Sequence, residues 1–367
     1  MTRSIHEHED WPHFRWDQES ILPLLAAVRH RQGRLLGQMQ SLGFALQEEA
    51  VLQTLTEDVV QSSSIEGERL DKAQVRSALA RRLGLDAGAL LSIDRNVEGV
   101  VEMLLNATQR YAEPLTEERL LGWLAALFPT GYSGLSRIQV GAWRDDASGP
   151  MQVVSGPIGS PKVHFEAPAA SRLSGEMAGF LAWFNDRSLP LDGVLKAGVA
   201  HLWFVTIHPF DDGNGRVARA IADLSLARSE ETGQRFYSLS AQIRKERKAY
   251  YDVLEFTQGR DLDITEWLSW FLGCLERALL GAEGTLETVL RKARFWKAHA
   301  QTNLSERQRL MLNRLLDGFT GKMTSSKWSV IAKCSQDTAL RDISDLVERS
   351  LLRRDTAGGR STGYVLD

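Results

Sequence analysis

Residues 208–219 place side chains suited to chemistry on a phosphate-bearing group within one short stretch, His-Pro-Phe-Asp-Asp-Gly-Asn-Gly-Arg-Val-Ala-Arg. His208 carries an imidazole that can be neutral near pH 7 and can accept a proton from a hydroxyl group. Asp212 offers a carboxylate, a ligand that suits Mg²⁺ when the ion also contacts phosphates. Arg216 and Arg219 offer planar guanidinium groups that match phosphate oxygens. The stretch therefore predicts a site that handles a polyphosphate.

The glycines of this stretch predict where its backbone turns into a helix. Gly213 and Gly215 permit backbone conformations that are closed to other residues and allow close approach to a ligand. Apolar residues at helical spacing then predict a helix over 216–228. Free amides and the positive end of the dipole at a helix start form an anion site. Arg216 and Arg219, three residues apart, would lie on neighbouring positions of this helix.

Most of the chain has apolar residues at three- and four-residue intervals, which predicts a mainly α-helical fold. A buried helix over 194–205 would deliver His208 on a loop, and Thr116 is the expected N-cap of another helix. The further expected helices are 22–44, 46–65, 97–112, 171–185, 247–258 and 264–280, followed by a helical linker. Residues 141–165 differ, because glycines and prolines surround the β-prone pieces 151–154 and 162–165. They predict a short β-hairpin flap.

The last part of the chain, 303–367, predicts a winged helix-turn-helix. Helices are expected over 304–316, 325–332 and 335–348, with Leu340, Ile343 and Leu346 on one face. Strands 351–354 and 364–366 would flank a Gly-rich turn, 355–360. This part holds 11 Lys and Arg and 8 Asp and Glu, a net charge of 11 − 8 = +3, which is a mild footprint for DNA. The acidic side chains of the third helix oppose DNA binding: Asp337, Asp342 and Asp345. DNA and protein both remain open as its partner.

Length and composition indicate a soluble protein of two or three domains. The chain has 367 residues, 43% of them hydrophobic and 25% charged, with a net charge of −3 and two cysteines. The expected divisions are 1–92, 93–280, the linker 281–302 and 303–367. The absence of a signal-like segment and of an apolar run long enough for a bilayer predicts a cytoplasmic protein without a membrane partner. Monomer and homodimer both remain open.

The stretch 208–219 resembles the Fic motif, His-x-Phe-x-(Asp/Glu)-Gly-Asn-Gly-Arg-x-x-Arg, at every fixed position, and the resemblance extends over 96–280. Most Fic proteins transfer AMP from ATP to a hydroxyl side chain of a target protein. The resemblance implies that His208 is the general base, that Asp212 holds Mg²⁺ and that Phe210 anchors the loop. Phosphate contacts are implied for Gly213, Asn214, Gly215, Arg216 and Arg219. A base pocket is implied for Tyr250, Tyr251, Leu254 and Gln258. The flap at 149–165 would align the target by strand addition.

Residues 62–67, Ser-Ser-Ser-Ile-Glu-Gly, form a second motif. Gly67 would end the preceding helix, which leaves Glu66 at the helix C-terminus, where the dipole disfavours a negative charge. An arginine is the partner that would stabilise it, although an exposed glutamate at an ordinary helix end explains the pattern too. The string resembles the inhibitory motif of the family, (Ser/Thr)-x-x-x-Glu-(Gly/Asn), which begins here at Ser62. The resemblance implies that Glu66 pairs with Arg219 and prevents ATP from placing its γ-phosphate.

Three functions follow from these patterns. The first is an autoinhibited protein adenylyltransferase with ATP as substrate and Mg²⁺ as cofactor. The second is the reverse reaction, in which Glu66 positions a water molecule that removes AMP from a modified protein. The third is a DNA-binding regulator whose Fic region senses a nucleotide. The aromatic segment that begins at Trp11 resembles an uncharacterised domain often attached to Fic cores.

Overall fold

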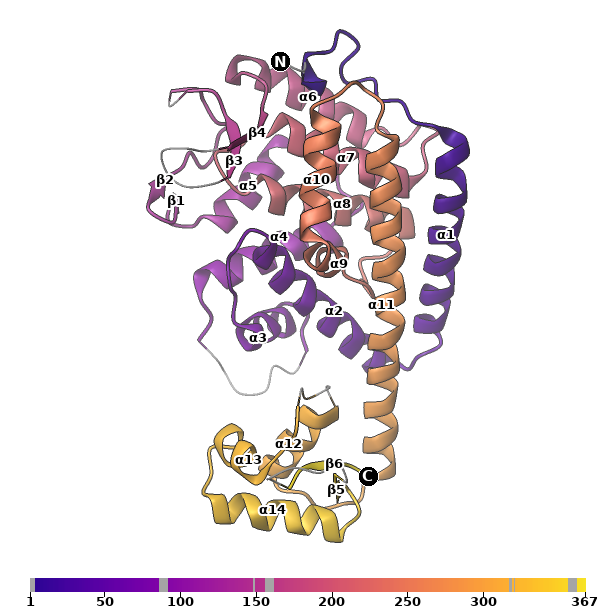
Figure 1. The fold of residues 1–367 in the computed structure, drawn as a ribbon, viewed down its shortest axis with the longest axis vertical. Coiled ribbons are helices and arrows are strands. Elements are labelled where there is room, and N and C mark those ends of the chain that lie inside the picture. Colours follow the sequence, from indigo (N-terminus) through magenta and orange to yellow (C-terminus); the bar gives the residue numbers. More distant parts are fainter. Residues whose placement is uncertain are drawn as a thin grey trace. The chain divides into compact units, whose positions relative to one another are not determined.

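The computed structural model describes residues 4–85, 92–147, 149–155, 162–316, 319, 321–355 and 362–367. Backbone contacts divide the chain into two units, Met1–Ala282 and Glu283–Asp367. The predicted mainly helical fold is confirmed, and the strands of the described residues form two-stranded antiparallel sheets (Figure 1). No helix among the described residues is long and apolar enough to cross a membrane.

Two buried helices, α7 (Gly193–Ile207) and α8 (Asn214–Glu230), pack side by side in the first unit. Every residue from Ala197 to Ile207 is buried, so α7 has no polar face. Asp192 begins α7 by accepting a hydrogen bond from the backbone N–H of Val194. The predicted helices 194–205 and 216–228 correspond to α7 and α8, which are longer at both ends. The loop between α7 and α8 carries the predicted chemistry.

Further helices surround this pair (Figure 1). They are α4 (Arg95–Gln109), α5 (Glu117–Leu127), α6 (Leu173–Asn185), α9 (Leu239–Lys245) and α10 (Arg247–Gln258). The predicted cap of α5 is confirmed, because the Thr116 hydroxyl accepts a hydrogen bond from the backbone N–H of Arg119 at 3.2 Å. These helices enclose the apolar sides of α7 and α8 and leave the loop at 208–213 accessible.

The N-terminal part contributes η1 (Ile5–Glu7), α1 (Gln18–Gln40), α2 (Phe44–Ile65) and α3 (Lys72–Arg82). The expectation that the first helix runs to Phe44 is wrong: Gly43 has an extended backbone and is the N-cap of α2, so Phe44 starts the second helix. Helix α2 packs against α9, α3, α4 and α8. It ends as predicted at Gly67, whose φ is +89°. The backbone N–H of Glu68 donates to the Ser63 carbonyl at 3.1 Å, which closes a Schellman turn.

Two small hairpins flank the loop at 208–213. The predicted flap is confirmed as β3 (Gln152–Ser155) paired with β4 (Lys162–Glu166), while 156–161 lie outside the described residues. A hairpin that was not predicted, β1 (Tyr132–Ser133) with β2 (Ser136–Arg137), precedes it. Its strands are too short to show the alternation on which a strand prediction depends.

The second unit has its own apolar core. Helix α11 (Thr265–Ala298) runs through most of the expected linker, and the unit continues with α12 (Glu306–Leu316), α13 (Ser325–Ile331), α14 (Gln336–Glu348), β5 (Leu352–Arg354) and β6 (Tyr364–Leu366). Strands β5 and β6 pair antiparallel, and residues 356–360 of the expected turn lie outside the described residues. Trp328, Ala339, Ile343 and Leu346 are buried in the core, whereas Leu340 is 42% exposed, so its placement on the buried face is wrong.

Two of the three acidic residues singled out in α14 have partners within the second unit. Asp342 accepts hydrogen bonds from Arg307 at 2.5 and 3.0 Å, and Asp345 accepts from Arg349 at 2.8 Å and from Gln308 at 2.7 Å. Two of the three carboxylates are thus engaged within the unit. Asp337, in the first turn, is exposed.

Candidate active site

His208 is the residue at which α7 ends. Its backbone adopts the left-handed conformation, with φ 51° and ψ 57°, which turns the chain out of the helix. The Nδ1 atom lies 3.1 Å from the Val205 carbonyl oxygen, so Nδ1–H donates there and Nε2 is left as the acceptor. Burial lowers the pKa of His208 to about 4; the Val205 carbonyl opposes this shift and the charge of Arg144 adds to it. The imidazole is therefore neutral near pH 7 and can accept a proton at Nε2.

Arg144 holds the loop on which His208 lies. Its buried guanidinium donates to the His208 carbonyl at 2.8 Å and to the Pro168 carbonyl at 2.6 Å, and its backbone N–H donates to Pro209 at 2.9 Å. Asp146 pairs with it at 3.1 Å. The sequence offered no signal for this role, because a single arginine outside the motif has no distinctive spacing.

Phe210 and Asn214 fix the turn from the loop into α8. Phe210 is fully buried, as expected for an anchor. Its backbone N–H donates to Asn214 Oδ1 at 3.1 Å, and Asn214 Nδ2 donates to the Phe210 carbonyl at 2.7 Å. The side-chain amide of Asn214 thus spans the loop backbone at both ends, and its phosphate contact stays a prediction.

Gly213 starts α8 with φ +82°, and a Cβ there would lie 3.0 Å from the Phe128 ring. Both the backbone angle and the lack of space require glycine. The first amides of α8 lack partners within the helix, so this end provides the predicted anion site. Gly213, Asn214 and Gly215 line a cavity of about 570 Å³ together with His208.

Asp212 lines the same cavity and is half-buried. Its Oδ2 accepts a hydrogen bond from the Ser133 hydroxyl of the β1–β2 hairpin, and its Oδ1 accepts from the Gly213 N–H. No cluster of three or more His, Cys, Asp or Glu side chains able to hold a metal ion occurs among the described residues. A single carboxylate fits Mg²⁺, because this ion is commonly held by one or two carboxylates, water and phosphate oxygens. Ser133 was not foreseen, since the hairpin itself was not predicted.

The four residues expected to form a base pocket all line the cavity: Tyr250, Tyr251, Leu254 and Gln258. Tyr250 is 1% exposed, and its hydroxyl lies 2.9 Å from His201 Nε2, so it mainly supports the cavity wall. Gln258 donates from Nε2 to the Thr206 hydroxyl at 3.1 Å. The flap faces these residues, and its His164 and Lys162 contact Glu255 of α10 at 2.6 and 3.1 Å.

Glu66 reaches across to the second arginine of the motif, as predicted. Its Oε1 lies 2.8 Å from Arg219 Nη1, and the Tyr251 hydroxyl donates to Oε2 at 3.2 Å. Ser62 adds two acceptors for Arg219, its hydroxyl at 3.0 Å and its carbonyl at 2.9 Å. Burial by itself would lower the pKa of Arg219, but Glu66 together with Tyr250 and Tyr251 outweighs it, so the pKa is raised. Gly215 leaves room for this contact, since a Cβ there would lie 2.3 Å from Glu66 Oε1.

Arg216, the first arginine of the motif, has an acidic partner that sequence reasoning missed. Its Nη1 donates to Glu68 Oε2 at 2.8 Å, and its guanidinium lies 4.9 Å from the centre of the Phe128 ring. Glu66 lines the 570 Å³ cavity, whereas Arg216 and Arg219 do not. The structure thus brings both arginines beside the anion site but covers them with the segment that follows α2.

Comparisons with known proteins show what two parts of this chain are similar to. Residues 114–226 match the family model described as Fic/DOC family, and residues 4–85 match a domain of unknown function, DUF4172. Both matches agree with the resemblances that the sequence shows.

The matched relatives include proteins named protein adenylyltransferase Fic. One from Culex quinquefasciatus is 27% identical over 231 residues, 60% of this chain and 40% of the relative. One from Aedes aegypti is 26% identical over the same length. This chain thus spans about 40% of the length of these relatives.

Two solved structures share the fold. A Fic family protein from Desulfovibrio desulfuricans G20 superposes with a TM-score of 0.56 at 21% identity, covering 96% of this chain and 97% of the other. A Fic domain containing signaling protein from Bacteroides thetaiotaomicron VPI-5482 gives 0.50 at 20% identity, covering 73% of this chain and 97% of the other. At these identities the likeness concerns the fold alone.

Proposed function

We propose that this chain is a protein adenylyltransferase that transfers AMP from ATP to a Ser, Thr or Tyr hydroxyl of a target protein and is held inactive by its own α2 segment. The neutral Nε2 of His208, the amides at the start of α8 and the carboxylate of Asp212 line one cavity. The name of the matched relatives supports the reaction class.

The reaction follows from the position of these groups. The target hydroxyl oxygen attacks the α-phosphorus, and its proton passes to His208 Nε2 as the new P–O bond forms. The bond between the α-phosphorus and the bridging oxygen breaks, and pyrophosphate leaves. Positioning and charge stabilisation supply most of the acceleration in such a transfer. Asp212 would hold a Mg²⁺ ion, which supplies charge neutralisation for the phosphates when bound.

Autoinhibition rests on one observation, the contact of the buried Arg219 with Glu66 and Ser62. A guanidinium in this position is suited to the terminal phosphates of ATP. While Glu66 occupies it, a polyphosphate meets a carboxylate instead of a cation. ATP that enters the cavity then lacks the contact that would align its α-phosphate with the acceptor.

The test uses ATP labelled at the α-phosphate and three proteins: the wild type, Glu66→Gly, and Glu66→Gly with His208→Ala. We expect strong labelling of protein by Glu66→Gly and little by the other two. Labelling that is equal in the wild type and Glu66→Gly would contradict autoinhibition. Labelling that survives His208→Ala would contradict the role of His208.

Removal of AMP is a second candidate, because Glu66 lines the cavity that holds His208 and could orient a water molecule there. A target that has been labelled by Glu66→Gly serves as substrate for this test. Loss of label on addition of the wild-type chain, but not of Glu66→Gly, would establish this activity.

For the second unit we propose a winged helix-turn-helix, with α13 and α14 as its paired helices and β5–β6 as its wing. Arg341 and Ser335 of α14 are exposed and Asp342 is engaged inward, which supports a contact with DNA more than the sequence did. A gel shift of the full chain with random duplex DNA, repeated with Arg341→Glu, tests it. Unchanged mobility of the DNA would leave protein docking as the role of this unit.

A further inference from the structure

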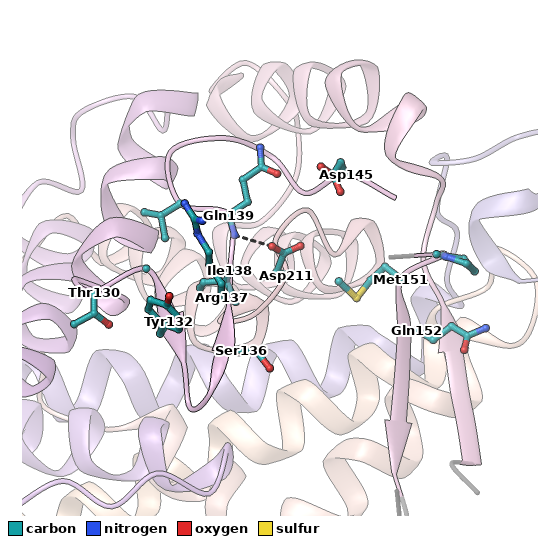
Figure 2. A pocket seen from close by; sticks show the side chains of 14 residues that line it. Thr130, Tyr132, Ser136, Arg137, Ile138, Gln139, Asp145, Met151, Gln152 and Asp211 are labelled. Carbon is teal, nitrogen blue, oxygen red and sulfur yellow. Dashed lines mark hydrogen bonds between the residues drawn. The ribbon is translucent and has the colours of Figure 1, made fainter. Parts of the chain in front are cut away.

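A second cavity of about 1000 Å³ adjoins the first and lies between the β1–β2 hairpin and the flap (Figure 2). The two cavities share Met151, Gln152 and Asp211. Asp211 occupies the variable position before Asp212 in the motif. Figure 2 shows Asp211 between the hairpin residues and the flap residues. A molecule in the second cavity therefore lies next to the proposed reaction site.

Two carboxylates line this cavity with spare hydrogen-bonding capacity. Asp211 Oδ2 accepts from the backbone N–H of Gln139 at 2.7 Å, and Asp145 Oδ1 accepts from that of Ala147 at 2.9 Å. Within the described part of the chain, the second oxygen of each has no hydrogen bond. Arg137 is the only cation among the described residues that line it. The lining side chains thus carry a net charge of 1 − 2 = −1, which favours a cationic occupant.

The hairpin beside the cavity exposes large apolar side chains. Tyr132 is 51% exposed and Leu135, at the turn, is fully exposed. Gly134 allows this turn with φ +55°. An exposed apolar tip next to a polar cavity has the composition of a protein-contact surface, in which aromatic and aliphatic anchors accompany polar groups.

The hairpin is tied to the reaction centre by hydrogen bonds. The Ser133 hydroxyl donates to Asp212, and the Gln139 N–H donates to Asp211. A partner that binds the hairpin is therefore placed at a fixed distance from His208 and Asp212. Such placement is what an acceptor protein needs for its hydroxyl to meet the α-phosphate.

We propose that this cavity recognises the acceptor protein, taking a lysine or arginine that lies near the modified hydroxyl against Asp145 and Asp211. An apolar side chain of the same segment packs on Tyr132 and Leu135. The inference rests on the proposed function in that the acceptor hydroxyl receives AMP. Docking of the acceptor protein itself requires no catalysis. The opposite outcome is that an acidic side chain of the acceptor protein pairs with Arg137. The test distinguishes a preference for a basic side chain from a preference for an acidic one.

The test measures binding to the full wild-type chain by fluorescence polarisation. The probes are labelled peptide pools with a central threonine and with lysine, alanine or glutamate fixed at each flanking position in turn. We expect the best lysine pool to bind about threefold to fivefold more tightly than the matching glutamate pool, as for one partly exposed charge pair. Asp145→Asn should remove this preference and Asp145→Lys should reverse it. Glu57→Gln, a remote exposed carboxylate of α2, should leave it unchanged.

Leu135→Ser tests the apolar part of the surface. It should weaken the binding of pools that contain apolar residues without altering the lysine preference. Equal binding of lysine and glutamate pools, a preference for glutamate, no binding at millimolar peptide, or a lysine preference that survives Asp145→Lys would each overturn the proposal.

The same pools incubated with Glu66→Gly and labelled ATP separate this inference from the proposed function. Lysine-selective binding without AMP transfer would refute the transferase and leave the docking surface standing. AMP transfer without lysine selectivity would refute the docking surface and leave the transferase standing.

Discussion

His208 combines two properties that its position at the end of α7 imposes. The left-handed backbone takes the residue out of the helix, and burial holds its pKa at about 4. The base is active when it is neutral, so lowering the pH through about 4 removes it, whereas raising the pH above that value does not.

The resulting prediction concerns the acidic limb of activity. In Glu66→Gly, kcat/KM for ATP should fall only as the pH approaches about 4, not near the value of about 6.5 that an unperturbed imidazole would give. Pyrophosphate release measured from pH 4 to 8 checks this. An acidic limb near 6.5 would show that His208 is solvated in the active form or is not the base. A loss of folded protein at low pH is monitored by circular dichroism on the same samples.

Ser133 is a positioning residue for Asp212. Its removal should let the carboxylate rotate, at a cost of about 1 kcal/mol, the net contribution of one typical hydrogen bond. Ser133→Ala in the Glu66→Gly background should therefore raise the Mg²⁺ concentration for half-maximal activity about fivefold. The control is Ser136→Ala, which removes the hydroxyl of the residue paired with Ser133 in the hairpin. Equal effects of the two variants would refute the role of Ser133.

At the level of residues, type and spacing supplied the candidates His208 and Asp212, both of which line the cavity. The resemblance supplied the pairing of Glu66 with Arg219, which is present in the structure. Arg144, Ser133 and Glu68 were missed because each acts through a contact between segments far apart in sequence. The loop-closing hydrogen bonds of Asn214 were not foreseen for a related reason, because they join its side chain to the backbone of Phe210 through the folded turn.

The end of α2 is the element to which we assign the proposed inhibition. Gly67 allows a Schellman turn at the end of α2. Glu66, just before this glycine, pairs with Arg219, and Glu68, just after it, pairs with Arg216. Arg244 and Arg247 also hold this turn, by hydrogen bonds to Ser64 and to the Ile65 carbonyl at 2.9 and 2.7 Å. Both arginines of the motif are thus paired with carboxylates that follow the same helix.

Glu68→Ala should therefore activate the enzyme in part, and it should add to Glu66→Gly. The Arg216–Glu68 pair is partly exposed on the glutamate side, so its removal should raise AMP incorporation about twofold to fivefold. The measured quantity is the initial rate of labelling for the two single variants and the double variant. Glu57→Ala, which breaks the exposed Lys72–Glu57 pair between α2 and α3, is the control. A rate for Glu68→Ala equal to that of Glu57→Ala would confine inhibition to Glu66.

Helical periodicity located the long elements but not their limits. Helix α2 begins at Phe44 because Gly43 supplies the extended backbone that precedes it, and the apolar pattern runs through this break. Helix α11 continues through the expected linker, since the residues there favour a helix whether or not a unit ends. The β1–β2 hairpin is held by its hydrogen bonds to Asp211 and Asp212, and these contacts leave no pattern in the sequence.

For the whole molecule, the proposed inhibition and the stability are linked through Arg219. Its side chain is 2% exposed, so loss of the Glu66 charge leaves a buried cation without its directly paired carboxylate, while the contacts with Ser62 remain. Removing one partner of an ion pair is destabilising, and because the Glu66 side chain is 31% exposed the cost lies below the roughly 3 kcal/mol of a fully buried pair. ATP would restore a negative charge at that place.

Glu66→Gln, which keeps the size of the side chain, should therefore melt at a lower temperature than the wild type in the absence of nucleotide. Saturating MgATP should raise its melting temperature more than that of the wild type, because Glu66 already occupies the site in the wild type. A ligand at a hundred times its Kd stabilises a protein by about 2.7 kcal/mol. Differential scanning fluorimetry with and without MgATP measures both shifts. His208→Ala should respond like the wild type, since it leaves Arg219 paired. Equal increases in melting temperature on addition of MgATP in Glu66→Gln and the wild type would mean that Glu66 does not compete with the nucleotide. The pairing of Arg219 with Glu66 would then not explain the proposed inhibition.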